Sequence, residues 1–245
     1  MIITRTPFRV SFAGGGSDLA AYYERFGGAV VSTAIDKYVY ISMHPYFFKN
    51  GYFLKYAKVE DTDSVDNIQH PIIREVMKLY NISGVDLNSS SDIPSGTGLS
   101  SSSAFTSGLI NACNAWNETY MTKEDIAEQA CHVEIDLLGE PIGKQDQYAC
   151  ACGGLNFIEF EKNGHVNIEK LLLTEAENLT NGNTVIKYYN FEGEFKREVA
   201  LDMNNLSAIV KVGNYLLVQY KVEVDKMSDD FDVIESDVKY NYDTY

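Results

Sequence analysis

The ten residues from Pro94 to Ser103 have the composition of a loop that binds a phosphate group. Two glycines break the chain, and the four serines from Ser100 to Ser103 lead into an apolar, helix-compatible stretch. Before the loop, residues 85 to 89 alternate like the end of a strand. A glycine turn between a strand and a helix directs backbone N–H groups and the positive end of the helix to one point. We therefore predict that this loop binds phosphate.

The loop differs from the G-x-x-x-x-G-K-[ST] phosphate loop because no lysine follows its glycines. Backbone N–H groups and the helix end must then supply the positive charge, and the hydroxyl of Ser102 could ligate Mg²⁺. The alternative interpretation is a flexible glycine–serine linker. We favour a folded loop, because Pro94 and Leu99 interrupt the run of glycine, serine and threonine, and apolar sequence lies on both sides of the loop.

Two carboxylates further along the chain, Glu134 and Asp146, could complete a site for phosphoryl transfer. Such a site needs one carboxylate on the metal ion and a second one beside the attacking hydroxyl. Glu134 falls in a helical pattern whose apolar face would be buried, and Asp146 follows a loop that contains Pro141 and Gly143. In a chain with 35 Asp and Glu residues, two solvated surface carboxylates are the alternative interpretation.

A third group of residues lies near the N-terminus, where an alternating strand runs into three glycines. Arg9 falls within this apolar strand, where a charge needs a partner. Asp18 follows the glycines from Gly14 to Gly16, which permit close approach of a ligand. The alternatives are an exposed strand arginine and an aspartate that, with Ser17, caps the helix that follows.

Composition and charge exclude some classes of partner and indicate where the chain is located. It has 245 residues and a formal net charge of −15, which argues against binding to nucleic acid or to an anionic membrane surface. We find no apolar run long enough for a membrane span and no secretory signal at the N-terminus, so the expected location is cytoplasmic. The four cysteines are expected to be buried thiols rather than disulfides.

Regular elements must hold these three groups of residues in place, and the hydrophobic pattern predicts an α+β fold. Strands are expected over residues 1–13, 29–46 and 155–160, the last one turned by Asn163-Gly164 into a hairpin. Helices are expected over residues 19–26, 70–80, 101–117, from 123 to about 137, and 145–151, and a further strand over 52–59.

The pattern predicts two domains, which meet near Leu173. Residues 1–172 are expected to form a mixed sheet with packed helices, and residues 173–245 a small β-rich segment. The strands expected in that segment cover residues 184–189, 194–201, 208–212 and 215–224. The last stretch, from about Asp225, is acidic and is predicted to be disordered.

Two motifs together resemble those of the GHMP kinases, a superfamily of sugar and small-metabolite kinases. Residues 94 to 102 match P-x-G-x-G-L-[GS]-S-S, and residues 7 to 18 match P-x-R-V-x-x-x-G-G-G-[ST]-D. The glycine triplet and the run Gly143-Lys144-Gln145-Asp146-Gln147-Tyr148 are similar to the branch that acts on D-glycero-D-manno-heptose 7-phosphate. The resemblance covers roughly residues 1 to 170 and implies an N-terminal lobe like domain 2 of ribosomal protein S5.

The resemblance also implies a function, the phosphorylation of the anomeric hydroxyl of that heptose phosphate with ATP and Mg²⁺. Ser102 and Glu134 would hold Mg²⁺, Asp146 would be the base beside the sugar hydroxyl, and Arg9 would lie near the transferred phosphoryl group. The implied sugar site is Gly15, Gly16, Ser17 and Asp18. The implied ATP site is Pro94, Ser95, Gly96, Thr97, Gly98, Leu99, Ser100, Ser101 and Ser102.

The second part of the chain departs from the family pattern. The glycine-rich motif of the family's C-terminal lobe is absent after about Leu173, so that lobe is expected to be truncated or replaced. Two alternative functions follow. One is a non-catalytic domain that binds nucleotide or sugar phosphate, and the other is a kinase for a different sugar, such as galactose or fucose.

Overall fold

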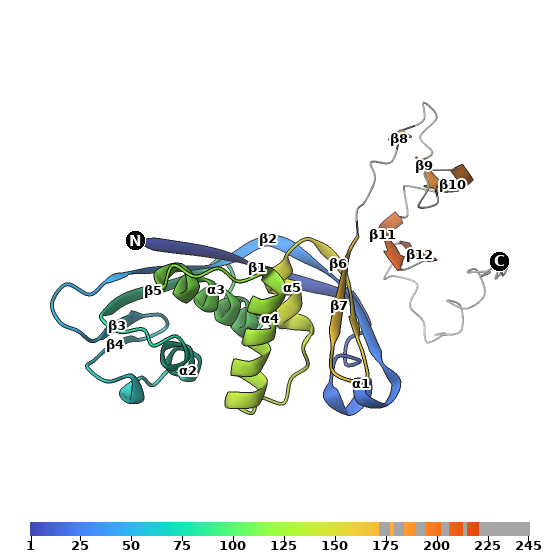
Figure 1. Cartoon of the computed structure of the whole chain (residues 1–245). Helices are drawn as coiled ribbons and strands as arrows, with labels where there is room; N and C mark the ends of the chain where they lie inside the picture. Colours follow the sequence, from blue (N-terminus) through green and yellow to red (C-terminus); the bar gives the residue numbers. More distant parts are fainter. Residues whose placement is uncertain (172–176, 179–183, 190–194, 202–205, 213–214, 221–245) are drawn as a thin grey trace, which may run out of the picture. The chain divides into compact units, whose positions relative to one another are not determined.

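The structure is a computed structural model that describes residues 1–171 and, in the rest of the chain, residues 177–178, 184–189, 195–201, 206–212 and 215–220 (Figure 1). The chain separates into two units, Met1–Leu172 and Leu173–Tyr245, each of which is described by itself. The first unit contains all the candidate site residues that the sequence analysis named.

A seven-stranded sheet forms the frame of the first unit. Its longest strand, β2 (Gly28–Pro45), pairs with β1 (Ile2–Ala13) along one edge. On the other edge, the first part of β2 pairs with β6 (Leu155–Phe160) and its last part pairs with β5 (Val85–Ser91). Every pairing in this sheet is antiparallel except that of β3 with β5. Beyond β5 the sheet continues with β3 (Tyr52–Lys55) and then the edge strand β4 (Val59–Thr62), and beyond β6 it ends at the edge strand β7 (Val166–Lys170).

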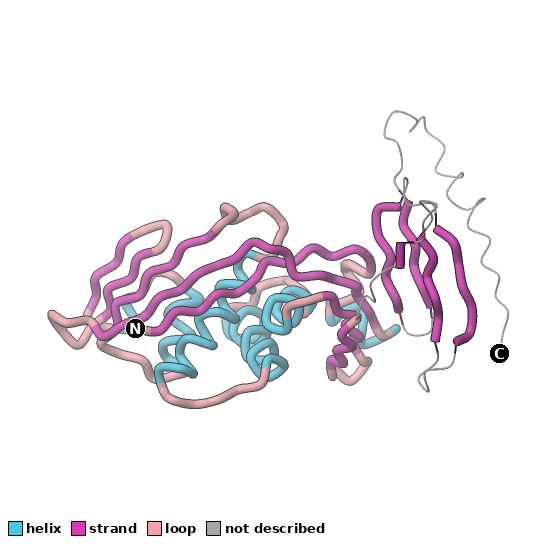
Figure 2. The backbone as a smooth tube through the Cα atoms, turned by 90° about the horizontal axis from the view of Figure 1, so that it is seen from above, coloured by secondary structure: helices cyan, strands magenta, loops and turns pink. Residues whose placement is uncertain are grey.

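Helices α2 to α5 cover one face of this sheet, as Figures 1 and 2 show from two directions. Buried side chains of the sheet, such as Phe8, Ile41 and Leu87, meet buried side chains of α3, such as Leu109, to form the core. The helices are α1 (Ala20–Phe26), α2 (Pro71–Leu79), α3 (Ser101–Trp116), α4 (Lys123–Cys131) and α5 (Gln145–Cys152), with a 3-10 turn η1 (Val65–Asn67) and a π-helical turn η2 (His132–Leu137).

Helix α3 packs closely on β1 because Gly108 has no side chain. A Cβ atom at position 108 would lie 2.7 Å from Oγ1 of Thr6, inside van der Waals contact. Two residues earlier in β1, the hydroxyl of Thr4 donates to the carbonyl of Gly108 at 3.0 Å. This contact fixes α3, and with it the loop that precedes α3, against the strand that carries Arg9.

The expected starts of two helices, near residues 70 and 123, are confirmed. Pro71 opens α2, and the side chain of His70 caps that helix by accepting from the N–H of Ile73. Thr122 caps α4 in a capping box with Asp125, in which each side chain accepts from the backbone N–H of the other residue. The four cysteines are free and buried, as predicted.

Three sequence predictions in the first unit are wrong in detail. The single strand expected over residues 52–59 is two strands, β3 and β4, because a turn at Tyr56 reverses the chain. The helix expected to run to Leu137 changes to π-helical geometry at His132. Asp18 does not cap α1, whose N-cap residue is Leu19 and carries no side-chain cap.

The second unit contains five strands in its described residues. Strands β8 (Glu177–Asn178), β9 (Thr184–Tyr189) and β10 (Phe195–Leu201) form one antiparallel sheet, and β11 (Leu206–Val212) pairs with β12 (Tyr215–Tyr220). These positions confirm the β-rich character expected there, although the short β8 was not predicted. The acidic stretch from Asp225 lies outside the described residues.

Within the described residues, no helix combines the length and the apolar character that a membrane crossing requires.

Candidate active site

The predicted phosphate loop lies at the surface, between the end of β5 and the start of α3. Residues 94 to 98 are all exposed. Gly96, Gly98 and Ser100 have positive φ angles of 82°, 74° and 67°, and such left-handed residues curl the backbone into concave sites for anions. Ser100 is the N-cap residue of α3 and makes no side-chain cap, so it leaves the first N–H groups of that helix to another acceptor.

Arg9 of β1 holds this loop in place. Its backbone N–H donates to the carbonyl of Leu99 at 3.4 Å, and its Nη1 donates to the carbonyl of Gly98 at 3.0 Å. The β1–β2 ladder shifts register between Pro7 and Arg9. Bulges of this kind redirect a side chain, and here Phe8 stays in the core while the next residue still reaches the loop.

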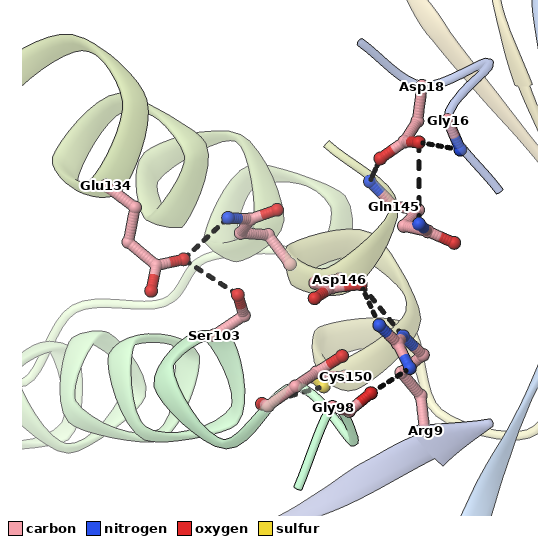
Figure 3. Close-up of polar contacts among 11 residues, drawn as sticks. Arg9, Gly16, Asp18, Gly98, Ser103, Glu134, Gln145, Asp146 and Cys150 are labelled. Carbon is pink, nitrogen blue, oxygen red and sulfur yellow. Dashed lines mark hydrogen bonds and ion pairs between the residues drawn. The ribbon is translucent and has the colours of Figure 1, made fainter. Parts of the chain in front are cut away.

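The guanidinium of Arg9 also pairs with Asp146, the second residue of α5 (Figure 3). Nη2 and Nε of Arg9 lie 2.6 and 2.8 Å from the same oxygen, Oδ1 of Asp146. Among the described residues, none donates a hydrogen bond to Oδ2 of Asp146. The two side chains are 11% and 27% exposed, so solvent and a ligand can reach the pair. Arg9 therefore fixes the orientation of Asp146 and leaves one carboxylate oxygen available to a hydroxyl group.

Glu134 lies in the π-helical turn η2 and is only 1% exposed. Its carboxylate accepts hydrogen bonds from the hydroxyl of Ser103 at 2.8 Å and from Nε2 of Gln147 at 2.6 Å, and Thr106 donates at 3.1 Å. Burial raises the pKa of Glu134 above its ordinary value, although these donors and Ser102 act in the opposite direction. The π-helical geometry, often found at functional sites, buries Val133 and Glu134 together.

A magnesium ion fits the environment of Glu134. The hydrogen-bond partners of this carboxylate in the described part of the chain are all neutral, so no cation compensates its charge. Buried carboxylates without such a partner are costly, and magnesium is usually held by one or two carboxylates together with the phosphates of the substrate. Ser102 is exposed next to it, at the start of α3.

The glycine turn near the N-terminus is tied to two other parts of the unit. The hydroxyl of Ser17 accepts from the N–H of Ala29 at 3.1 Å and lies 2.7 Å from the carbonyl of Gly14. Asp18 is 3% exposed and its carboxylate faces the first residue of α5, Gln145 (Figure 3). Gly15 and Gly16 are exposed. Of the predicted sugar site, only the two glycines are therefore freely accessible.

Three residues around Glu134 were not identified from the sequence. Ser103 is the fourth serine of the run, Thr106 follows one helical turn later, and Gln147 is the neighbour of Asp146. The i, i+3 spacing of Ser103 and Thr106 places both hydroxyls on one face of α3. That spacing was a usable signal, whereas the role of Gln147 depends on the contact between α5 and η2.

The fold and the site define an α+β domain that presents a glycine-rich loop, residues 94 to 100, at the start of the buried helix α3. Residues 67–154 match the family model described as the GHMP kinases N terminal domain. This part of the chain is therefore similar to the N-terminal domain of the GHMP kinases.

The same family appears among individual relatives. The chain is 31% identical over 209 residues to the D-glycero-alpha-D-manno-heptose 7-phosphate kinase of Campylobacter jejuni, a match that spans 80% of this chain and 61% of the relative. It is 28% identical over 160 residues to the galactokinase of Thermococcus kodakarensis, with 60% and 43% covered. The fold also matches the crystal structure of a D-glycero-D-manno-heptose 1-phosphate kinase from Bacteroides thetaiotaomicron, with a TM-score of 0.66 and 24% identity over 71% of this chain and 61% of that one.

Proposed function

We propose that the chain is an ATP-dependent sugar kinase that transfers a phosphoryl group to a hydroxyl of a phosphorylated sugar. The observation that carries this proposal is the Arg9–Asp146 pair beside the predicted phosphate loop. Nη1 of the same arginine donates to the carbonyl of Gly98 in that loop. One guanidinium thus links the loop that would bind the phosphates of ATP to the carboxylate that would accept the proton of the sugar hydroxyl. Phosphoryl transfer depends mainly on such positioning and on charge neutralisation.

Each predicted residue has a role in this proposal. The backbone of residues 95 to 101 binds the phosphates, Arg9 stabilises the charge of the transferred group, and Asp146 orients the attacking hydroxyl through its free oxygen. Glu134 and Ser102 would hold Mg²⁺, which neutralises the phosphate oxygens when it is bound. The exposed glycines Gly15 and Gly16 would face the sugar.

The substrate that we propose is D-glycero-D-manno-heptose 7-phosphate, phosphorylated at its anomeric hydroxyl. The Campylobacter relative, named as a kinase of a heptose 7-phosphate, aligns over 80% of this chain and supports the choice of sugar. The galactokinase relative favours a second candidate, a kinase for a free sugar such as galactose. In both cases the match spans less than two thirds of the relative's own length.

The test is ATP consumption by the purified chain with Mg²⁺ and a panel of sugars and sugar phosphates. Turnover with heptose 7-phosphate, and formation of its 1,7-bisphosphate, is the expected result. Turnover with galactose or fucose instead would support the second candidate. If ATP binds without turnover on any member of the panel, the chain is a non-catalytic binding domain and the kinase proposal is wrong.

A further inference from the structure

Helix α5 begins without a capping side chain of its own. Its N-cap residue, Lys144, makes no side-chain hydrogen bond to the first turn. The N–H groups of a first turn have no partner within the helix, and a buried helix start needs acceptors from elsewhere. Asp146, which pairs with Arg9, lies in this first turn, so the acceptor that fixes the turn also fixes the carboxylate.

Asp18 supplies that acceptor from 127 residues earlier in the chain. Its Oδ2 accepts from the N–H of Gln145 at 3.2 Å, and its Oδ1 lies 3.4 Å from Nε2 of the same residue. The backbone carbonyl of Asp18 also accepts from the N–H of Lys144, at 3.3 Å. A carboxylate at this position has the favourable sign for the positive end of a helix.

The chain around Asp18 is built to receive this contact. Oδ1 of Asp18 also accepts from the N–H of Gly16 at 3.1 Å, so the carboxylate joins the glycine turn to α5. A Cβ atom at position 143 would lie 1.9 Å from Oδ2 of Asp18, which means that only glycine leaves room for the carboxylate there. Gly143 and Asp18 are thus complementary although they lie far apart in the sequence.

We infer that Asp18 is a positioning residue, which caps α5 and so holds Asp146 in its orientation toward the reacting hydroxyl. This inference rests on the proposed function for its catalytic consequence. Since three N–H groups already surround the buried carboxylate of Asp18, its contribution goes through α5 rather than through direct binding of the sugar. The glycine turn remains the part of this segment that faces the sugar.

Steady-state kinetics of Asp18→Asn test the inference. The asparagine keeps the size of the side chain but removes its charge and one acceptor. We expect kcat to fall by about tenfold to a hundredfold, because small misplacements of a catalytic group have effects of that size. The KM for the sugar should stay within about threefold of the original value. A large rise in KM with unchanged kcat would identify Asp18 as a direct sugar ligand and overturn the inference.

Two further variants separate positioning from a general loss of stability. Gly143→Ala places a methyl group where the Asp18 carboxylate lies, so it should reproduce the fall in kcat, and the double variant should be no worse than either single one. Thr122→Ala, which removes the cap of α4, is the matched control. It should lower the Tm but leave kcat within about twofold, because the start of α4 meets the last residue of α5, where Lys123 donates to the carbonyl of Cys152, at the opposite end of the helix from Asp146.

Amide hydrogen exchange makes the test independent of activity. In Asp18→Asn, the N–H groups of Gln145 and Asp146 should exchange about tenfold faster, while α3 keeps its protection. If exchange at the start of α5 is unchanged, Asp18 does not cap this helix and the inference is wrong. If exchange rises but the wild-type chain phosphorylates no sugar, the proposed function fails and the capping role stands.

Discussion

Gln147 donates a hydrogen bond from Nε2 to Oε2 of Glu134 at 2.6 Å, across the space between α5 and η2. The residue before it, Asp146, pairs with Arg9. Consecutive residues of a helix point about 100° apart, so one turn of α5 serves both carboxylate sites. The distance between the carboxylate predicted for the metal and the carboxylate predicted for the base is therefore set by a single rigid element.

The clearest prediction on catalysis concerns Asp146. Asp146→Asn keeps the size of the side chain but cannot accept a proton from the sugar hydroxyl. We expect kcat to fall by about a hundredfold to ten-thousandfold, the usual contribution of a general base. Titration of an ATP analogue should show nucleotide binding within about threefold of the original affinity, because the phosphate loop does not include this residue. Turnover at the original rate would remove Asp146 from the reaction.

Glu134 gives a prediction for stability as a function of pH. Because burial raises its pKa, the folded chain holds the proton of Glu134 at pH values where the unfolded chain has lost it. The ionised group thus destabilises the fold as pH rises from the ordinary pKa of glutamate, about 4.3, through the raised pKa of the folded chain. Without metal, Glu134→Gln should raise the Tm across that range, by an amount that increases with pH. A Tm difference that does not depend on pH would contradict this account.

The neighbouring serines of α3 should behave differently from each other. Ser103 is fully buried and donates to Glu134, so Ser103→Ala should lower the free energy of unfolding by about 1 to 3 kcal/mol. Ser102 is exposed, so Ser102→Ala should leave the Tm unchanged and raise the Mg²⁺ concentration needed for half-maximal turnover. Chemical denaturation and a magnesium titration measure the two effects. If the two variants lost the same stability and needed the same Mg²⁺ concentration, the two hydroxyls would have no separate roles.

Gly98 should be sensitive to substitution for a conformational reason. Its φ of 74° is in the left-handed region, and a Cβ there would meet no atom within 4 Å. Gly98→Ala should therefore cost about 1 to 2 kcal/mol through backbone strain rather than through a clash. The carbonyl of Gly98 accepts from Arg9, so we expect the strained loop to raise the KM for ATP. Gly164→Ala, at a hairpin turn with a similar φ of 87°, is the control that should leave this KM unchanged.

Local sequence signals were sufficient for most of the elements that position the site. The alternation of residues 1–13, the glycine–serine turn and the apolar stretch after it predicted β1, the loop and α3. These elements are set by periodicity and by turn residues, which act over a few positions. The contacts between Arg9 and Asp146, or between Glu134 and Ser103, link residues far apart in the chain, so spacing alone could not establish them.

The role of Asp18 could not be predicted from the residues next to it in the sequence. An aspartate after glycines and before an apolar run is a typical cap for the helix that follows it. The structure instead turns the carboxylate toward Gln145, because Gly143 leaves an opening there. A cap supplied from another part of the chain leaves no local pattern. The π-helical turn at Glu134 was also missed, and the partners that hold its carboxylate come from α3 and α5 rather than from neighbouring residues in the sequence.

A crystal structure of the chain with Mg²⁺ and a non-hydrolysable ATP analogue tests the proposed kinase site most directly. We expect the phosphates to lie within hydrogen-bond distance of the backbone N–H groups of residues 95 to 101, with the terminal phosphate facing the Arg9–Asp146 pair. We also expect density for the metal ion between that phosphate and the side of α3 that carries Ser102 and faces Glu134. A nucleotide bound elsewhere, with no phosphate at residues 95 to 101, would contradict the assignment of this loop and of the kinase site built around it.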